Sequence, residues 1–202
     1  MVVRSRRIME GKVVMKTDEL YPLKEIPPPP DESAGQSDSL KVTLRPAKPA
    51  DEDAIDAFLK IVSSDRIYSR FQTKTAPEGH AQAMAYADGR GTVSILAFAE
   101  SDGQERLAGI GMYGTKDMPL STGDVGLLVH QDYQERGLGK MLVRELASKA
   151  RMNGLKRLEF MYAADNDHMR RIIASAHRSG LVVIEKDAST YPGVRKVIVS
   201  IV

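Results

Sequence analysis

The amino-acid sequence predicts a mixed α/β fold, in which helices cover both faces of one β-sheet. Two observations lead to this expectation. Apolar residues occur either in strand-sized runs or at steps of three and four, and the second spacing is typical of an amphipathic helix. The segment 123–163 also reads as strand, helix and strand, and two such strands that are parallel neighbours need a right-handed crossover.

A break in composition near residue 39 divides the chain of 202 residues. Residues 27–30 are four consecutive prolines, and the polar stretch 31–39 follows them. A proline run is extended, and such a polar stretch buries too little apolar surface to fold. We therefore expect 1–39 to be an N-terminal extension with a proline-rich linker, and 40–202 to be the folded domain. The extension could dock on this domain or on the partner subunit of a homodimer.

The first half of the domain reads as one strand, two helices and three strands. A strand over 40–45 is closed by Pro46, and an amphipathic helix follows over 51–62. We expect a second helix over 77–87, because Asp88-Gly89 is a stop signal. The three strands are expected over 92–99, 107–113 and 123–129, and the short turn at 101–104 makes the first two a hairpin.

The second half reads as helix, strand, helix and two strands. Apolar residues recur every four positions from 138 to 150, and Asn153-Gly154 ends that helix. The next strand is expected over 157–163, and the helix after it should end at Gly180. The last two strands are expected over 181–184 and 196–201.

The composition excludes several kinds of site and partner. The chain has no Cys, which excludes a thiolate nucleophile and a cysteine zinc site. No His pair has metal-ligand spacing, so we expect no metal. Lys and Arg number 29 against 27 Asp and Glu, so a nucleic-acid partner is not favoured. No apolar run approaches about 20 residues and the N-terminus lacks a signal sequence, so we expect a cytoplasmic protein with no membrane partner.

The segment 129–140 contains the clearest sign of chemistry. An apolar run ends at Val129, a polar loop follows, and Gly137 and Gly139 open a long helix. The first N–H groups of a helix lack internal partners and attract anions, and glycine lets a phosphate approach the backbone. The alternative is a plain strand-to-helix turn, because Gly-x-Gly alone is a weak signal and fits neither the Walker nor the dinucleotide pattern.

In its context this loop resembles the coenzyme A pyrophosphate loop of the GNAT N-acetyltransferases, through Gln134, Gly137 and Gly139. The segments 42–53, 63–71 and 166–181 are similar, in the same order, to parts of the acetyltransferase domain of bacterial protein-lysine acetyltransferases. The resemblance extends over nearly all of 40–202. It implies the acyl-CoA N-acyltransferase fold, with a sheet that splays at its centre, and acetyl-CoA (coenzyme A) as the cofactor.

The resemblance also implies roles for single residues. Pantetheine would pair with the backbone of Leu127 and Val129, and an N–H group of this stretch, at Leu128, would polarise the acetyl carbonyl. Asp124 stands where the protein-lysine acetyltransferases have a glutamate, so it is the candidate general base, unless it only belongs to a polar turn. The remaining residues implied to bind the cofactor are Gln134, Glu135, Arg136, Gly137, Leu138, Gly139, Lys140 and Asn166.

The general acid departs from the family pattern. Many members have a tyrosine four residues before the late glycine, and this chain has Ala176 there. Tyr162, Tyr113 or water could protonate the thiolate, or the thiolate, whose thiol has a pKa near about 8.5, could leave without help. We expect structural roles for His130, His168 and His177. Arg170 and Arg171 are expected to be solvated, or to contact the 3′-phosphate of coenzyme A. Arg66 and Arg70 could line the acceptor channel or form surface ion pairs.

Three functions remain open at this point. The resemblance favours an acetyl-CoA-dependent acetyltransferase whose amine acceptor is a lysine of a protein. The second function is acetylation of a small amine, such as an amino acid or a polyamine, because acceptor loops vary independently of the cofactor half. The third is a non-catalytic acyl-CoA sensor, which Ala176 and the short side chain of Asp124 leave open.

Overall fold

The computed structural model describes residues 41–71, 73–101, 103–115 and 121–202. The expected N-terminal extension, 1–39, lies outside these residues. The elements in chain order are β1 (Val42–Pro46), η2 (Pro49–Asp51), α1 (Glu52–Ile61), α2 (Ser64–Phe71), α3 (His80–Ala85), β2 (Thr92–Ser101), β3 (Gln104–Gly114), β4 (Thr122–Val129), η3 (Gln131–Tyr133), α4 (Leu138–Met152), β5 (Arg157–Ala163), α5 (Asp167–Arg178), β6 (Val182–Tyr191) and β7 (Val194–Ile201).

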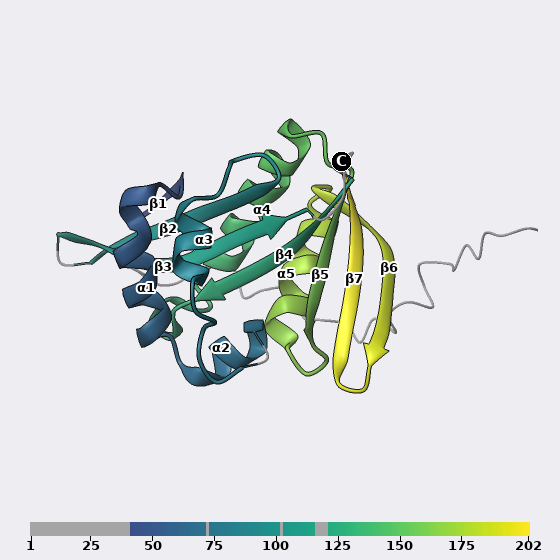
Figure 1. Cartoon of the computed structure of the whole chain (residues 1–202). Helices are drawn as coiled ribbons and strands as arrows, with labels where there is room; N and C mark the ends of the chain where they lie inside the picture. Colours follow the sequence, from purple (N-terminus) through teal and green to yellow (C-terminus); the bar gives the residue numbers. More distant parts are fainter. Residues whose placement is uncertain (1–40, 72, 102, 116–120) are drawn as a thin grey trace, which may run out of the picture. The chain divides into compact units, whose positions relative to one another are not determined.

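In the described part of the chain the strands form one seven-stranded sheet, in the order β1-β2-β3-β4-β5-β7-β6 (Figure 1). All neighbouring strands are antiparallel except β4 and β5, which are parallel and joined by α4. The expected parallel pair and the expected hairpin of β2 and β3 are therefore confirmed. The parallel pair matters most, because its two C-terminal ends meet at one edge of the sheet.

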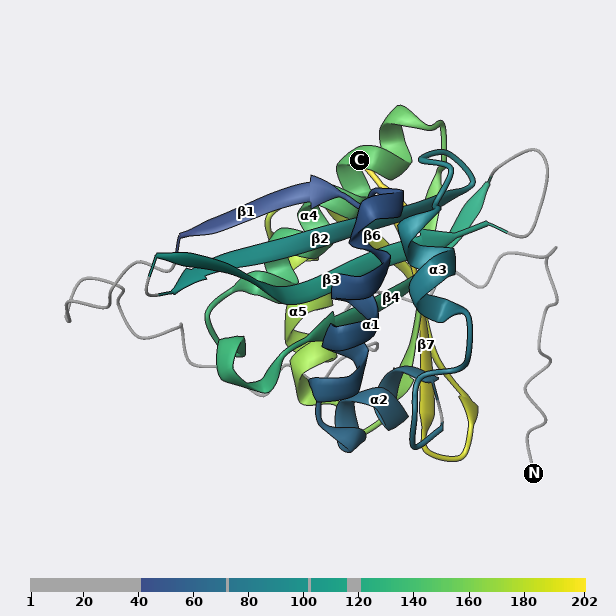
Figure 2. The same cartoon turned by 60° about the vertical axis from the view of Figure 1, so that its left-hand side comes forward.

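Two apolar clusters place helices on both faces of the sheet, as the sequence predicts (Figures 1 and 2). On one face α4 and α5 pack through residues such as Leu142, Leu146 and Ile173. On the other face α1, α2 and α3 pack against side chains of the middle strands that include Ile110 and Leu128. Each fully buried Leu, Ile or Phe contributes about 1.5–3 kcal/mol to folding, so these clusters fix which face each helix covers.

Several elements differ from the sequence-based expectation, and the largest difference in length is at β6, which extends over Val182–Tyr191 and not only over 181–184. Helix α2 was not expected from the sequence. Ile67 is part of the buried core, but α2 has too few apolar residues at helical spacing to show a clear period. Helix α3 is six residues long, much shorter than the predicted 77–87. Pro46 is the last residue of β1, one position beyond the predicted strand, and β1 is an edge strand, where a residue without an N–H group is tolerated.

Within the described ranges, none of the helices is both long enough and apolar enough to cross a lipid bilayer. In the same ranges, His, Asp and Glu side chains do not gather in a group of three that could hold a metal ion.

A chain that begins near residue 40 is expected to fold and to keep its cofactor site. The physical reason is that the two apolar clusters are built from residues 42–201. The test is to compare the melting temperatures of the full and the shortened chain, each with and without coenzyme A. Loss of folded protein on shortening would show instead that residues 1–39 contribute to the core or to a subunit contact.

Candidate functional site

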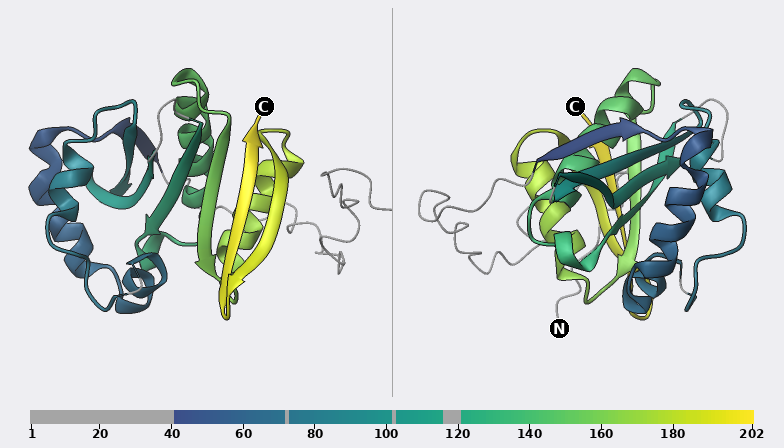
Figure 3. Two further views of the ribbon diagram at one scale, coloured as in Figure 1. Left: turned by 45° about the vertical axis from the view of Figure 1, so that its right-hand side comes forward. Right: turned by 90° about the vertical axis from the view of Figure 1, so that its left-hand side faces the viewer.

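Strands β4 and β5 separate before either of them ends. Their pairing runs from Thr122 and Arg157 to Val125 and Phe160, but β4 continues to Val129 and β5 to Ala163. Figure 3 shows the two strands moving apart toward their C-terminal ends. The last four residues of β4 therefore pair with β3 on one side and with no described strand on the other, and we call this unpaired side of β4 the opening.

Backbone direction along β4 decides which groups face this opening. The N–H of His130 donates to the carbonyl of Ala108 at 2.9 Å, so these two residues form a hydrogen-bonded pair of the β3–β4 ladder. Such pairs alternate, so Leu128 also directs its N–H and C=O at β3. The groups directed at the opening belong to Leu127 and Val129. The structure thus places the backbone of Leu128 away from the opening, which differs from the expectation for that residue.

The loop between β4 and α4 has an unusual backbone. Glu135 has φ of 60°, and among the described residues it is the one non-glycine residue with positive φ. Gly137, the N-cap of α4, has φ of 85°. Backbone strain of this kind costs about 1–3 kcal/mol and clusters at functional sites. Lys140 and Met141 donate to the carbonyl of Gly137, so the N–H groups before them stand ahead of the first helical hydrogen bond and can meet an anion.

Glycine is required at positions 137 and 139 for two different structural reasons. A Cβ atom added at Gly137 would have no neighbour within 4 Å, so only its backbone conformation requires glycine. A Cβ atom added at Gly139 would lie 2.6 Å from Cδ1 of Ile172 on α5. Gly139 therefore allows α4 and α5 to approach each other, which the expectation of a phosphate-binding glycine did not include.

Alanine at position 139 is expected to couple energetically to residue 172. Gly139→Ala should force the Cδ1 end of the Ile172 side chain to move, at a cost near the low end of about 1–3 kcal/mol because that end is flexible, offset in part by the better helix propensity of alanine. Ile172→Val removes the atom that would clash, so the double variant should be more stable than the two single effects predict. A double-mutant cycle of unfolding free energies measures this coupling. Additive effects would show that Gly139 does not serve helix packing.

Helix α2 is tied to the loop by side-chain hydrogen bonds. Arg66 donates to Oε1 of Gln134 at 2.7 Å, and Nε2 of Gln134 donates to the carbonyl of Val129 at 3.3 Å. The N–H of Ser63, at the start of α2, donates to Oε1 of Gln131 at 3.3 Å. Arg66 therefore holds the loop in place. Figure 1 shows α2 beside the C-terminal end of β4.

Asp124 is exposed on β4, and alternation places it on the α2 side of the sheet together with Gly126. The guanidinium of Arg70 lies against Gly126, because a Cβ atom added there would overlap it. Burial lowers the pKa of Arg70, and the nearby charge of Asp124 opposes that shift. The structure thus brings Asp124 and Arg70 together next to the opening.

His80 is the residue of this site that sequence reasoning missed. It is the first residue of α3, and burial lowers its pKa, with a further contribution from the charge of Arg70. Nothing in the sequence near His80 indicates that it belongs to the site, because only the fold brings this part of the chain close to Arg70 and Asp124.

The structure separates the two tyrosines that were candidates for the general acid. The hydroxyl of Tyr113 accepts a hydrogen bond of 2.7 Å from Asn153, beyond the C-terminal end of α4 and so at the opposite end from the loop. Tyr162 lies on β5 two residues past the last pair with β4 and faces the α4–α5 side. Burial raises the pKa of Tyr162, and the charge of Asp187 raises it further, so its hydroxyl stays protonated.

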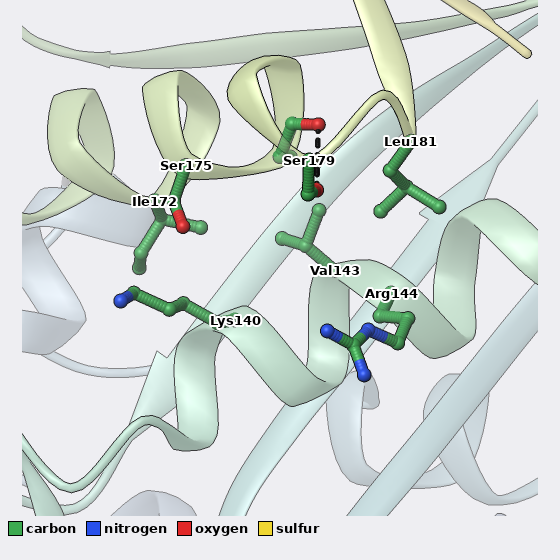
Figure 4. A pocket seen from close by; sticks show the side chains of 8 residues that line it. Lys140, Val143, Arg144, Ile172, Ser175, Ser179 and Leu181 are labelled. Atoms are coloured by element: carbon green, nitrogen blue, oxygen red, sulfur yellow. Dashed lines mark hydrogen bonds between the residues drawn. The ribbon is translucent and has the colours of Figure 1, made fainter. Parts of the chain in front are cut away.

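A small pocket of about 60 Å³ lies between α4 and α5, next to the first turn of α4 (Figure 4). Lys140 and Arg144 line it from α4, and Ser175 and Ser179 line it from α5. Ala176, which stands where many members of the resembled family have a tyrosine, lines the same pocket.

The remaining polar residues around α5 have local partners. The Oδ1 atom of Asn166 accepts a hydrogen bond from the N–H of Met169 at 3.1 Å and thereby caps α5. Arg170 pairs with Asp167 at 2.7 Å, and Arg171 lies 3.1 Å from His168. His177 lies 3.1 Å from the carbonyl of Val182, which links α5 to β6.

His130 also has a local role, since its ring accepts a hydrogen bond from the N–H of Asp132 at the start of η3. His130 and Asn166 thus fix the starts of η3 and α5 through their side chains.

The chain matches known proteins both in sequence and in structure. The sequence model of the family described as Acetyltransferase (GNAT) domain matches residues 41–177. The chain is similar in structure to the GNAT domain of S. lividans PAT, with a TM-score of 0.67, 19% identity, and coverage of 81% of this chain and 94% of that one.

Two further solved structures are similar to the chain. Ribosomal-protein-S5-alanine acetyltransferase from Vibrio fischeri gives a TM-score of 0.61 with 16% identity, over 79% of this chain and 91% of that one. The structure of yncA from Salmonella typhimurium, with its cofactor acetyl-CoA, gives a TM-score of 0.58 with 16% identity, over 80% of this chain and 93% of that one.

Proposed function

The chain belongs to the GNAT acetyltransferase family, and we propose that it transfers the acetyl group of acetyl-CoA to the side-chain amine of a lysine in a protein. Family membership makes the chain an N-acetyltransferase with acetyl-CoA as its donor. One observation supports the site: β4 leaves β5 directly before the strained loop and the N-terminus of α4. The lysine acceptor is supported by the resemblance of 63–71 and 166–181 to protein-lysine acetyltransferases.

The residues present fit coenzyme A at two places. The open edge of β4, with the N–H and C=O groups of Leu127 and Val129, fits the amides of the pantetheine arm. The N-terminus of α4, which begins after the left-handed Gly137, fits the pyrophosphate, and Lys140 adds a positive charge in the same turn. When bound, the cofactor supplies the acetyl group as a thioester.

Backbone groups at this edge also polarise the acetyl carbonyl in our proposal. Because Leu128 faces β3, this role passes to the N–H of Leu127 or Val129. A preorganised donor of this kind is worth roughly 3 kcal/mol in an acyl transfer. No side chain is needed for this step, so the geometry of β4 alone provides it.

Two side chains would handle protons. Asp124, on the α2 side of the sheet, would accept the proton of the lysine ammonium, directly or through water, since an aspartate is one methylene shorter than the glutamate it replaces. Tyr162, on the opposite side, keeps its proton and would donate it to the leaving thiolate. The two groups thus lie on opposite faces of the sheet.

The test is a thiol-release assay with acetyl-CoA and three acceptor pools: unrelated proteins rich in lysine, free amino acids with polyamines, and buffer alone. The proposal predicts release that depends on the protein pool and an acetyl group on lysine Nε, located by mass spectrometry of the acceptor. Release with the small amines alone would reject the protein acceptor and favour a small-amine enzyme. Binding of coenzyme A without release from any pool would contradict the catalytic assignment.

A further inference from the structure

Arg70 places a positive charge at the point where β4 leaves β5. Its guanidinium lies on Gly126, the first residue of β4 beyond the last β4–β5 pair. Gly126 makes room for it, because any side chain there would overlap the guanidinium. Arg70 is also one helical turn from Arg66, which is held by Gln134 of the cofactor loop. Arg70 therefore lies on the same face of α2 as Arg66, the residue that contacts the loop.

Burying a guanidinium is unfavourable unless the site compensates for it. Burial lowers the pKa of Arg70, yet an arginine stays charged in proteins because its ordinary pKa lies far above neutral pH. The charged or titratable groups that face it are Asp124 from β4 and His80 from α3. The next carboxylate, Glu159 on β5, is paired with Lys196 at 2.7 Å. Arg70 is thus a permanent cation in a partly dry site.

Resting on the proposed function, we propose that Arg70 sets the charge state of the acceptor: its fixed positive charge disfavours the ammonium form of the bound amine. A lysine amine has a pKa near about 10.4, so nearly all of it is protonated at neutral pH and cannot attack a thioester. A cation nearby makes the neutral amine easier to form, and desolvation at the same place acts in the same direction.

Arg70 and Asp124 then act on the same proton. The carboxylate of Asp124 provides the acceptor for the proton, and the guanidinium of Arg70 lowers the cost of removing it from the amine.

The experiment measures kcat against pH from 7 to 10.5, with saturating acetyl-CoA and a lysine peptide blocked at both ends. For the parent, the rise of kcat should have its midpoint below that of the free amine. Arg70→Gln should move this midpoint upward by about 1–2 pH units, so that kcat at pH 8 falls by about 10- to 100-fold and recovers at high pH. Arg70→Lys keeps the charge and should keep most of the parent profile.

Arg66→Gln is the matched control, because it removes a cation from the same helix but one that contacts the loop. It should raise the KM for acetyl-CoA and leave the midpoint of kcat in place. If Arg70→Gln melts at a lower temperature than the parent, Arg70→Met is used in its place, because methionine is also neutral and similar in length.

Two results would overturn the inference. A fall in kcat at every pH without a shift of the midpoint would mean that Arg70 only holds α2 or Asp124 in place. Absence of turnover by the parent with the blocked peptide would reject the proposed lysine acceptor, and the role of Arg70 would be rejected with it.

Discussion

Asparagine at position 124 is expected to lower turnover by about 100-fold or more at neutral pH, which corresponds to about 2.7 kcal/mol of activation free energy. Asp124→Asn keeps the shape of the side chain and removes the carboxylate that is proposed to accept the proton. The affinity for acetyl-CoA should stay close to that of the parent, because Asp124 lies in the paired part of β4 and not beside the cofactor loop. Part of the rate should return at high pH, where the amine is neutral without help.

The measurement is a pH–rate profile of thiol release, together with the affinity for acetyl-CoA by calorimetry. Asp124→Glu should retain activity, since it restores the residue of the resembled enzymes. Glu159→Gln is the matched control, because Glu159 is the register partner of Asp124 on β5 and is paired with Lys196. If Asp124→Asn acetylates its acceptor at the parent rate at pH 7, the base lies elsewhere, and His80 becomes the next candidate.

The second large effect is expected at Gly137, where valine should abolish the stabilisation by coenzyme A. Coenzyme A at about 100 times its Kd should add about 2.7 kcal/mol to the unfolding free energy of the parent, which is easily seen in a melting curve. Gly137→Val keeps open space around the side chain, but a β-branched residue strongly disfavours φ of 85°. The loop should therefore change conformation and lose the alignment of its N–H groups.

Gly137→Asn is the matched control, because asparagine tolerates a left-handed backbone far better than valine. It should keep most of the rise in melting temperature. An unchanged rise in Gly137→Val would show that coenzyme A does not bind through this loop. Equal loss in both variants would show that the missing side chain, and not the backbone conformation, is what the site requires.

Strong local signals predicted much of the fold. The helix over 138–152 and the strand over 157–163 were predicted within a residue, because each has a clear apolar period and a clear stop signal. The parallel pairing of β4 and β5 followed from the strand-helix-strand order. Helix α2 was missed because its stability comes from its contacts with the loop and with β4, and only a small part from its own apolar residues.

The residues of the candidate site also divide into those that the sequence predicts and those that require the tertiary structure. Gln134, Gly137 and the start of α4 were identified from a short motif, because neighbours in the sequence are neighbours in the loop. Leu127 and Val129 were already expected to pair with pantetheine, but the proposal that one of them, and not Leu128, polarises the carbonyl required the register of β3 and β4. Period-two alternation reverses the direction of every backbone group when the register shifts by one residue.

By itself, the sequence determined the α/β class and the family resemblance, and it predicted the position of a candidate cofactor loop, since each depends on residues that are close along the chain. Only the tertiary structure decided that Gly139 packs against Ile172, that Arg66 holds Gln134, and that Arg70 lies beside Asp124 and His80. These contacts join segments far apart in the sequence. The physical reason is that burial and electrostatics depend on distance in space, and the folding of α2 and α3 against β4 brings those charges together.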